Sequence, residues 1–281
     1  MSKPPSQLFF PVSFNELFSA WNRFPAAVPY AGGTDLIGRQ GKSIIDLPPV
    51  ILCLEKIGDL HRITRSEHYL EIGAMVKLNR LSKLGKIAPP VLCACLENIG
   101  GVQLRNIATI GGNICSASRM YDIPALLAAF DAKYELRNAN NTRWVSASRF
   151  HSTDDKNRHI TVLENQELLT RIRLPLHQWD YSIYKKLHPN DMYNNEILIF
   201  LAKARKNILS DIKVVYKANT ILRNKNAEDI LIGKQLPLNH KIAVDFIDNW
   251  KEFLAEKDEL NEFSKNALLN YIEENVFIIS D

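Results

Sequence analysis

The sequence lacks the features that mark secreted and membrane proteins. No apolar run approaches the roughly 20 residues that a membrane-spanning helix requires, and the nearest candidate, residues 123–130, is far shorter. The chain begins Met-Ser-Lys-Pro-Pro, without the apolar core of a signal peptide. We therefore expect a protein that has no membrane span and is located in the cytoplasm.

Cysteine is scarce as well, with four in the chain. Cys93 and Cys95 are close together and Cys115 follows, but zinc and iron–sulfur sites usually need two short-spaced cysteine pairs, or cysteine joined by histidine. The second pair is missing, so no metal site is predicted on this chain. A cytoplasmic location also argues against a disulfide framework, and all four cysteines, including Cys53, are interpreted as reduced thiols.

Neither sign of charge dominates the chain. Lysine and arginine number 35 against 31 aspartates and glutamates, and the net charge of +4 is too small and too dispersed to indicate a nucleic-acid partner. The 281 residues, 46% of them hydrophobic, suffice for the core of one large or two modest domains. No internal repeat or low-complexity linker interrupts the chain.

The hydrophobic periodicity changes along the chain and predicts a mixed α and β protein in three zones, residues 1–57, 58–178 and 179–281. Glycine and proline mark many of the element ends. The expected strands are 26–30, 43–47, 61–64, 69–72, 133–137, 143–145, 167–174, 181–187 and 197–202. The expected helices are 14–21, 78–84, 91–99, 123–130, 226–232, 242–256 and 261–279.

Two glycine pairs are the candidates for ligand binding in the sequence. Gly32 and Gly33 follow a predicted strand, in Ala-Gly-Gly-Thr-Asp, and Gly111 and Gly112 stand in Thr-Ile-Gly-Gly-Asn. A backbone without Cβ approaches a ligand closely and adopts positive φ, so consecutive glycines let successive N–H groups converge on a phosphate oxygen. Two such turns in different lobes would hold the diphosphate of a dinucleotide from both sides. Each pair by itself would equally suit an ordinary turn.

Neither glycine motif matches the common nucleotide-binding fingerprints. The Rossmann pattern Gly-X-Gly-X-X-Gly and the Walker pattern ending in Gly-Lys-Ser/Thr are both absent from these motifs. The hydroxyls of Thr34 and Thr109, next to the glycines, add further donors. The residues therefore favour a dinucleotide clamp made of main-chain amides over a Rossmann fold or a nucleotide hydrolase.

The surroundings of the glycine pairs closely resemble a known family. The stretch Gln-Leu-Arg-Asn-Ile-Ala-Thr-Ile-Gly-Gly-Asn-Ile at 103–114, followed by Asp122 in Asp-Ile-Pro-Ala-Leu-Leu, is similar to the FAD-binding subunit of molybdopterin-containing dehydrogenases. Xanthine dehydrogenase and the carbon monoxide dehydrogenase flavoprotein belong to that family. Residues 31–36 resemble its first flavin loop and residues 71–74 a strand of its second lobe. The resemblance covers roughly residues 8–187.

The resemblance implies an α+β fold. A two-lobed PCMH-type FAD-binding domain would occupy residues 1–178, with lobes at about 1–57 and 58–178, and a smaller α+β C-terminal domain would occupy 179–281. FAD would lie between the lobes without a covalent link, because neither glycine motif contains His or Cys. The residues expected to bind FAD are Pro29, Tyr30, Ala31, Gly32, Gly33, Thr34, Asp35, Leu36, Ile99, Thr109, Ile110, Gly111, Gly112, Asn113, Asp122, Leu169 and Lys185.

Four of these residues have a role implied by the resemblance. Asp122 corresponds to an acidic residue near the adenosine half of FAD, although it would equally serve as a helix N-cap. Ile99 stands where some relatives place an aromatic side chain against the flavin. Leu169 matches an apolar flavin contact and is also a typical buried strand residue. Lys185 matches a lysine near the isoalloxazine edge, where a cation stabilises reduced flavin, and its alternative is a solvated surface lysine.

The implied function is electron transfer within a complex. The chain would accept electrons from iron–sulfur clusters on one partner subunit and pass them through FAD to NAD or another acceptor, while a molybdopterin-binding subunit hydroxylates the substrate. The iron–sulfur clusters and the molybdenum cofactor are thus expected only on partners. NAD stays open as the acceptor, because residues 188–191 read His-Pro-Asn-Asp and lack the arginine that some relatives carry after the lysine.

Two alternatives remain open from the sequence. A stand-alone flavin oxidoreductase of the same fold would need its own proton donor beside the flavin, and no residue declares itself for that role. A flavin-free binding or assembly subunit would keep the scaffold without the cofactor, although the two intact glycine motifs argue against it.

Overall fold

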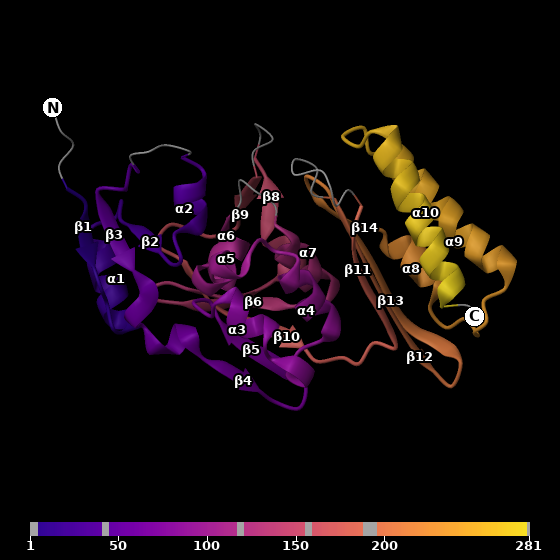
Figure 1. The fold of residues 1–281 in the computed structure, drawn as a ribbon, viewed down its shortest axis with the longest axis horizontal. Coiled ribbons are helices and arrows are strands. Elements are labelled where there is room, and N and C mark those ends of the chain that lie inside the picture. The colour runs from indigo at the N-terminus through magenta and orange to yellow at the C-terminus, as the bar shows by residue number, and fades with distance from the viewer. Residues whose placement is uncertain (1–4, 41–44, 117–120, 155–158, 188–195, 280–281) are drawn as a thin grey trace. The chain divides into compact units, whose positions relative to one another are not determined.

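The computed structural model describes residues 5–40, 45–116, 121–154, 159–187 and 196–279. The chain divides into two compact units, residues 1–176 and 177–281 (Figure 1). The division falls two residues before the predicted boundary at 178. Both units combine helices with sheets, which agrees with the predicted fold class. None of the helices in the described ranges has the length and apolar content that crossing a bilayer requires.

The first part of unit 1, which we call lobe 1, is built on a three-stranded parallel sheet in the order β1-β3-β2. Helix α1 (Phe14–Arg23) begins where the Ser13 hydroxyl accepts a hydrogen bond from the Glu16 N–H. Its apolar face buries Leu17, Phe18 and Trp21, as the periodicity predicted. The other elements of lobe 1 are β1 (Gln7–Phe9), β2 (Val28–Tyr30), α2 (Thr34–Gly38) and β3 (Val50–Cys53).

One predicted strand of lobe 1 is wrong. Residues 45–47 form no strand, whereas 43 and 44 lie outside the described residues. The strand instead begins after Pro49, at β3, where Ile51 and Leu52 are buried between the two neighbouring strands. Proline has no N–H for a sheet ladder, so the central strand starts only where the two consecutive prolines end.

The rest of unit 1, lobe 2, is built on a five-stranded antiparallel sheet in the order β4-β5-β10-β6-β7. Burial alternates along β5, where Leu70 and Ile72 are buried and Glu71 is partly exposed. This is the period of two expected for a sheet with one covered face. The strands are β4 (Ile63–Arg65), β5 (Tyr69–Gly73), β6 (Lys133–Arg137), β7 (Thr142–Ser146) and β10 (Leu168–Pro175).

Five helices complete lobe 2, and three of them match predicted helices. All eight residues of α7 are buried, which agrees with the apolar run seen in the sequence. Two short helices, α5 and α6, were not predicted. The helices are α3 (Leu78–Ser82), α4 (Pro90–Glu97), α5 (Val102–Ile107), α6 (Ile110–Cys115) and α7 (Asp122–Ala129). The smaller elements of unit 1 are 3-10 turns at Leu54–Lys56, Gly58–His61, Gly85–Ile87 and Ala147–Arg149. A short strand pair consists of β8 (His151–Thr153) and β9 (His159–Thr161).

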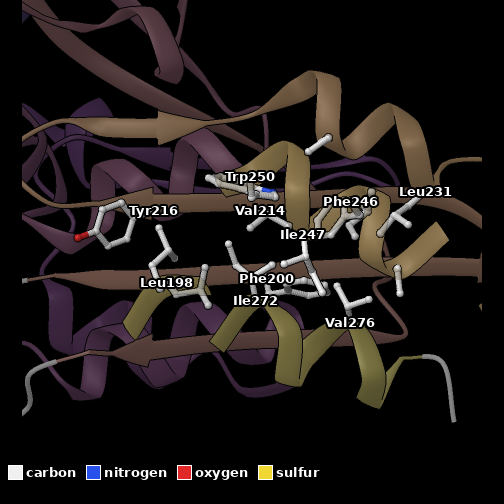
Figure 2. Packing of buried hydrophobic residues seen from close by; sticks show 14 of the residues in the cluster. Leu198, Phe200, Val214, Tyr216, Leu231, Phe246, Ile247, Trp250, Ile272 and Val276 are labelled. Carbon is white, nitrogen blue, oxygen red and sulfur yellow. The ribbon is translucent and has the colours of Figure 1, made fainter. Parts of the chain in front are cut away.

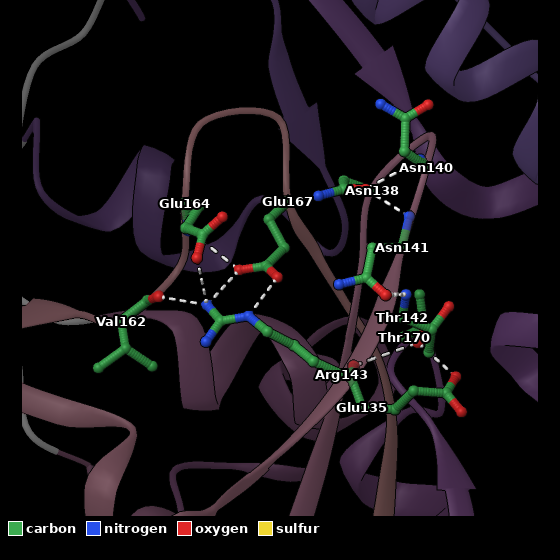
Figure 3. A network of polar contacts seen from close by, with 10 residues as sticks. All are labelled: Glu135, Asn138, Asn140, Asn141, Thr142, Arg143, Val162, Glu164, Glu167 and Thr170. Atoms are coloured by element: carbon green, nitrogen blue, oxygen red, sulfur yellow. Dashed lines mark hydrogen bonds and ion pairs between the residues drawn. The ribbon is translucent and has the colours of Figure 1, made fainter.

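An ion pair between Arg143 and Glu167 holds the residue that directly precedes β10. The Arg143 guanidinium donates to both carboxylate oxygens of Glu167, each at 2.7 Å, and to the Val162 carbonyl at 2.9 Å (Figure 3). The Glu167 side chain is 2% exposed. Burial alone would raise the pKa of this carboxyl, but the bonds and charge of Arg143 lower it below its usual value. The pair therefore holds the start of β10 against β7 in ionised form.

Unit 2 is a four-stranded antiparallel sheet, in the order β11-β12-β13-β14, with helices against one face. Phe200 and Val214 of the sheet point toward Phe246 and Trp250 of the helix α9 (Figure 2). Every predicted element of this unit is present, whereas β13 and β14 were missed. The elements are β11 (Tyr181–Lys186), β12 (Ile197–Arg205), β13 (Ile208–Lys217), β14 (Ile221–Arg223), α8 (Lys225–Leu231), α9 (His240–Ala255) and α10 (Glu262–Ile278).

Candidate functional site

The first glycine loop, residues 31–34, connects β2 to α2. Gly33 has a φ of 69° and stands at the N-cap of α2. This left-handed conformation favours glycine, because a side chain there is strained. A Cβ at Gly33 would also collide with the ring and hydroxyl of Tyr30, which lies directly beneath it. The turn thus requires glycine for its own geometry.

The first glycine loop presents main-chain donors that the protein does not use. The N–H groups of Gly32, Gly33 and Thr34 donate no hydrogen bond to any residue that the structure describes. All three residues are partly exposed. Amides without a protein acceptor are energetically costly unless water or a ligand satisfies them, so this loop is suited to an anionic group.

The second glycine motif, residues 109–113, is not the turn that was predicted. Gly111 and Gly112 lie in the first turn of α6, and Thr109 is the N-cap of that helix. The Thr109 hydroxyl oxygen accepts the Gly112 N–H at 3.1 Å. Threonine at an N-cap satisfies a helix donor in this way, and that local signal favours a helix over a glycine turn here.

The amides of the second motif are already engaged within lobe 2. The Gly111 N–H donates to the Ala74 carbonyl at 2.8 Å and the Ile110 N–H to the Val76 carbonyl at 3.0 Å. A Cβ at Gly111 would lie 2.6 Å from the Cβ of Ala74. The Gly111 and Gly112 amides thus have acceptors within the protein, and phosphate binding by this glycine pair stays a prediction. The Thr109 hydroxyl can still donate its proton, because it only accepts from Gly112.

The two glycine motifs lie against each other, as a shared site requires. A Cβ at Gly32 would collide with the main-chain carbonyl of Ile107, just before the second motif. A Cβ at Gly112 would lie 3.9 Å from the Cβ of Ala31. The first glycine loop of lobe 1 is thus seated on the segment that leads into α6 of lobe 2.

A polar network, which we call the Asp35 network, joins the same two segments. The Asp35 carboxylate pairs with the Arg39 guanidinium and accepts a hydrogen bond from the Tyr121 hydroxyl at 3.1 Å. Arg39 also donates to the Ser116 hydroxyl at 2.9 Å. Burial would raise the pKa of Asp35, but Arg39, Ser116 and Tyr121 together lower it. The carboxylate is accordingly ionised at neutral pH.

Comparison with known proteins identifies the family. Residues 4–177 match the family described as the FAD binding domain in molybdopterin dehydrogenase. The chain belongs to this family. FAD is accordingly its cofactor and its class is oxidoreductase, as the sequence predicted. The matched span covers unit 1 from residue 4 onward, and both glycine motifs belong to it.

Members of this family and related structures show how far the likeness extends. The chain is 29% identical over 214 residues to the glyceraldehyde dehydrogenase medium chain of Sulfolobus acidocaldarius, and the alignment covers 74% of each chain. It is 29% identical over 216 residues to the carbon monoxide dehydrogenase medium chain of Afipia carboxidovorans, covering 75% and 73%. The solved structure of quinoline 2-oxidoreductase from Pseudomonas putida 86 aligns with 100% of this chain and 98% of its own, with a TM-score of 0.80 at 20% identity, which shows a common fold.

The donor set of the first glycine loop fits the diphosphate of FAD. The unused amides of Gly32, Gly33 and Thr34 and the hydroxyl of the neighbouring Thr109 are the donors that a diphosphate needs. Pro29 lies in β2, opposite Leu52, at the start of this region. Other predicted residues near it are Tyr30, Ala31, Asp35 and Leu36, which end β2 or open α2.

Two further predicted residues lie on helices of lobe 2. Asn113, on α6, is 9% exposed, and its buried Oδ1 atom has no hydrogen-bond partner within the described ranges. Asp122 is buried and is the first residue of α7, whereas Tyr121 is the N-cap. The ordinary alternative for Asp122, an N-cap, is therefore wrong by one position, and ligand contact by Asp122 stays a prediction.

The remaining predicted residues lie in different settings. Ile99 is half-buried after α4, and its carbonyl accepts from Arg105 at 3.1 Å. Leu169 is 2% exposed within β10, which is the ordinary strand setting anticipated for it. Lys185 belongs to unit 2, on β11, where its ammonium lies 5.3 Å from the centre of the Tyr271 ring. Flavin contact by these three residues stays a prediction.

Sequence reasoning missed three residues of the Asp35 network. Arg39 carried one readable signal, because it stands four residues after Asp35, the spacing of an intrahelical ion pair, although no helix was predicted there. Ser116 and Tyr121 carried none, since their partners are remote in the chain. Their role becomes visible only when the lobes are folded together.

Proposed function

We propose that this chain is the FAD-carrying electron-transfer subunit of a molybdenum hydroxylase complex of the xanthine dehydrogenase type. The observation that carries the proposal is the first glycine loop, whose unused amides lie against the second motif of a chain in the FAD-binding family. The carbon monoxide and glyceraldehyde dehydrogenase relatives are named medium chains, which supports a role as one subunit among several.

The chain's own residues bind and orient the cofactor in this proposal. Gly32, Gly33 and Thr34 donate main-chain hydrogen bonds to the diphosphate, and Thr109 donates its hydroxyl proton from lobe 2. Asp122 accepts hydrogen bonds from ribose hydroxyls, and Ile99 supplies apolar contact. Bound FAD supplies the redox chemistry, taking up single electrons and releasing them in pairs.

The electrons come from partner subunits in this proposal. In the ranges that the structure covers, no group of three or more His, Cys, Asp or Glu side chains is placed to hold a metal ion. None of the four cysteines, all of which lie in the described ranges, forms a disulfide. We therefore assign the iron–sulfur clusters and the molybdopterin cofactor to other chains, and we place the complex in the cytoplasm.

The electron acceptor is proposed to be NAD or another acceptor. Lys185 would stand at the isoalloxazine edge, where its charge stabilises reduced flavin. The segment at 188–191, which lacks the arginine of some relatives, lies outside the described residues. Titration of the purified complex with NADH distinguishes the two acceptors, because only an NAD site allows NADH to bleach the flavin rapidly.

Isolation of the chain from its native cell tests the proposal. We expect the visible spectrum of a flavin, its complete release by acid, and two co-purifying subunits, one with iron–sulfur absorbance. A colourless chain that cannot be reconstituted with FAD would favour the assembly-subunit alternative. A yellow chain that turns over a small substrate without partners would favour the stand-alone oxidoreductase.

A further inference from the structure

The Asp35 network poses an electrostatic problem for a diphosphate site. Asp35 comes directly after the first glycine loop, so a carboxylate stands one residue beyond the proposed main-chain donors. A diphosphate carries negative charge, and an uncompensated carboxylate beside it would repel it. The Asp35 side chain is 24% exposed, a position where screening by water is incomplete.

The Arg39 guanidinium, on a side chain that is 42% exposed, pairs with that carboxylate. On a solvated helix face, an ion pair four residues apart is weak and mobile. Here Arg39 is also anchored across the lobes by the Ser116 hydroxyl, which is 6% exposed, and Tyr121 donates to the other carboxylate oxygen of Asp35. The charge of Asp35 is therefore compensated by a cation that has a second contact, in lobe 2.

Resting on the proposed function, we propose that Arg39 is a positioning residue for FAD: it cancels the Asp35 charge beside the diphosphate site and, through Ser116, holds the first glycine loop on lobe 2. Arg39 acts through Asp35 and touches no part of the cofactor in this proposal. The residue thereby sets the affinity for the anionic half of FAD.

A double-mutant cycle separates charge cancellation from simple mechanical support. The full-length chain is stripped of flavin and titrated with FAD, with the quenching of flavin fluorescence as the signal. We expect Arg39→Gln to weaken binding at least tenfold. Adding Asp35→Asn to Arg39→Gln should recover at least fivefold of that loss, because the repelling charge has gone. If the double variant binds no better than Arg39→Gln, charge cancellation is refuted.

The dependence of FAD affinity on salt concentration separates charge cancellation from a merely structural role, because salt screens only the electrostatic effect. The loss caused by Arg39→Gln should shrink markedly between 0.05 and about 1 M salt, since the screening length falls to roughly 3 Å at the upper concentration. Arg39→Lys keeps the charge and should retain most of the affinity, which also covers the case that the glutamine variant does not fold. An affinity lost equally with lysine and glutamine, at every salt concentration, would overturn the proposal.

A matched control comes from another local ion pair of unit 1. Arg62 pairs with Asp59 three residues earlier, at 3.1 Å, and belongs to neither glycine motif. Arg62→Gln should leave FAD affinity within twofold of the parent chain. Failure of the parent chain itself to bind FAD would refute the proposed function and this inference with it, whereas a bound parent with an unaffected Arg39→Gln variant would refute the inference alone.

Discussion

The Gly111 N–H donates a hydrogen bond to the Ala74 carbonyl oxygen at 2.8 Å, and the two residues approach so closely that a Cβ at Gly111 would lie 2.6 Å from that of Ala74. The bond joins α6 to the chain segment that follows β5. The second glycine motif thus takes part in backbone packing, while the Gly32, Gly33 and Thr34 amides of the first glycine loop donate to no residue that the structure describes.

Gly111→Ala should therefore destabilise the protein even without FAD. Forcing a methyl group into this contact costs about 1–3 kcal/mol, as overpacking usually does. Urea unfolding of the flavin-free chain, followed by circular dichroism, measures the change. Gly38→Ala is the matched control, because a Cβ there would meet no described residue outside its own helix and chain neighbours within 4 Å, and it should be neutral or slightly stabilising. Equal stability of the two variants would contradict this account of the second motif.

Gly33→Ala should weaken FAD binding more than it weakens the fold. Alanine pays about 1–2 kcal/mol for the left-handed conformation, and the new Cβ displaces Tyr30 at the proposed donor loop. Gly85 offers the comparison, because its φ is also positive, at 56°, but its surroundings are open. Both variants should lose stability in urea, Gly33→Ala the more because of its contact with Tyr30, and only Gly33→Ala should raise the dissociation constant for FAD, by at least tenfold. A Gly85→Ala variant with the same binding defect would show that general destabilisation is responsible.

Glu167→Gln should destabilise unit 1 by about 2–3 kcal/mol at neutral pH, because Arg143 loses its buried partner and keeps only the longer, exposed contact with Glu164. The folded-state pKa of Glu167 is lowered, so the ion pair contributes fully above the pKa of an unfolded glutamate, about 4.3. The contribution is lost as the pH falls through the lower folded-state pKa. Urea unfolding at pH 7 and at pH 3 should show the gap between parent and variant narrowing in acid. Glu164→Gln is the control, because its pair with Arg143 is longer, at 3.5 Å, and its side chain is 66% exposed; a cost as large as that of Glu167→Gln would be unexpected.

Lys185→Met should lower the reduction potential of bound FAD if the lysine stands at the flavin edge. Loss of a cation that stabilises the reduced form by about 1.4 kcal/mol shifts a two-electron potential by roughly 30 mV. Equilibration of the assembled complex with redox dyes measures the potential. Lys186→Met is the natural comparison, since successive strand residues point to opposite faces, and it should leave the potential unchanged. Identical potentials in both variants would remove Lys185 from the flavin site.

Most helices and strands could be predicted, because hydrophobic periodicity is a property of residues that are close together in the sequence. The apolar stripe of α1 and the alternation along β5 are examples. The strand at β3 was misplaced because residues 43–47 show a similar apolar pattern, and only pairing with β1 and β2 selects the buried run. Short helices such as α6 were missed where a Thr109 N-cap outweighed two glycines.

The sequence located the candidate site, but it did not show which main-chain amides of that site already have partners in the protein. Both glycine motifs were identified, and the structure places them together. The sequence did not show which amides are engaged within the protein, since that depends on Ala74 and Val76, which accept the amides at the start of α6 from a remote part of the chain. The Asp35 network was hidden for the same reason.

The most direct test of the main-chain donor site is the response of individual glycine amides to FAD. The chain has 12 glycines, so selective ¹⁵N-glycine labelling gives a simple amide spectrum that single Gly→Ala variants assign. On saturation with FAD we expect large downfield proton shifts at Gly32 and Gly33, and little change at Gly111, which keeps Ala74 as its acceptor. Saturating FAD that leaves the Gly32 and Gly33 resonances in place would contradict the account.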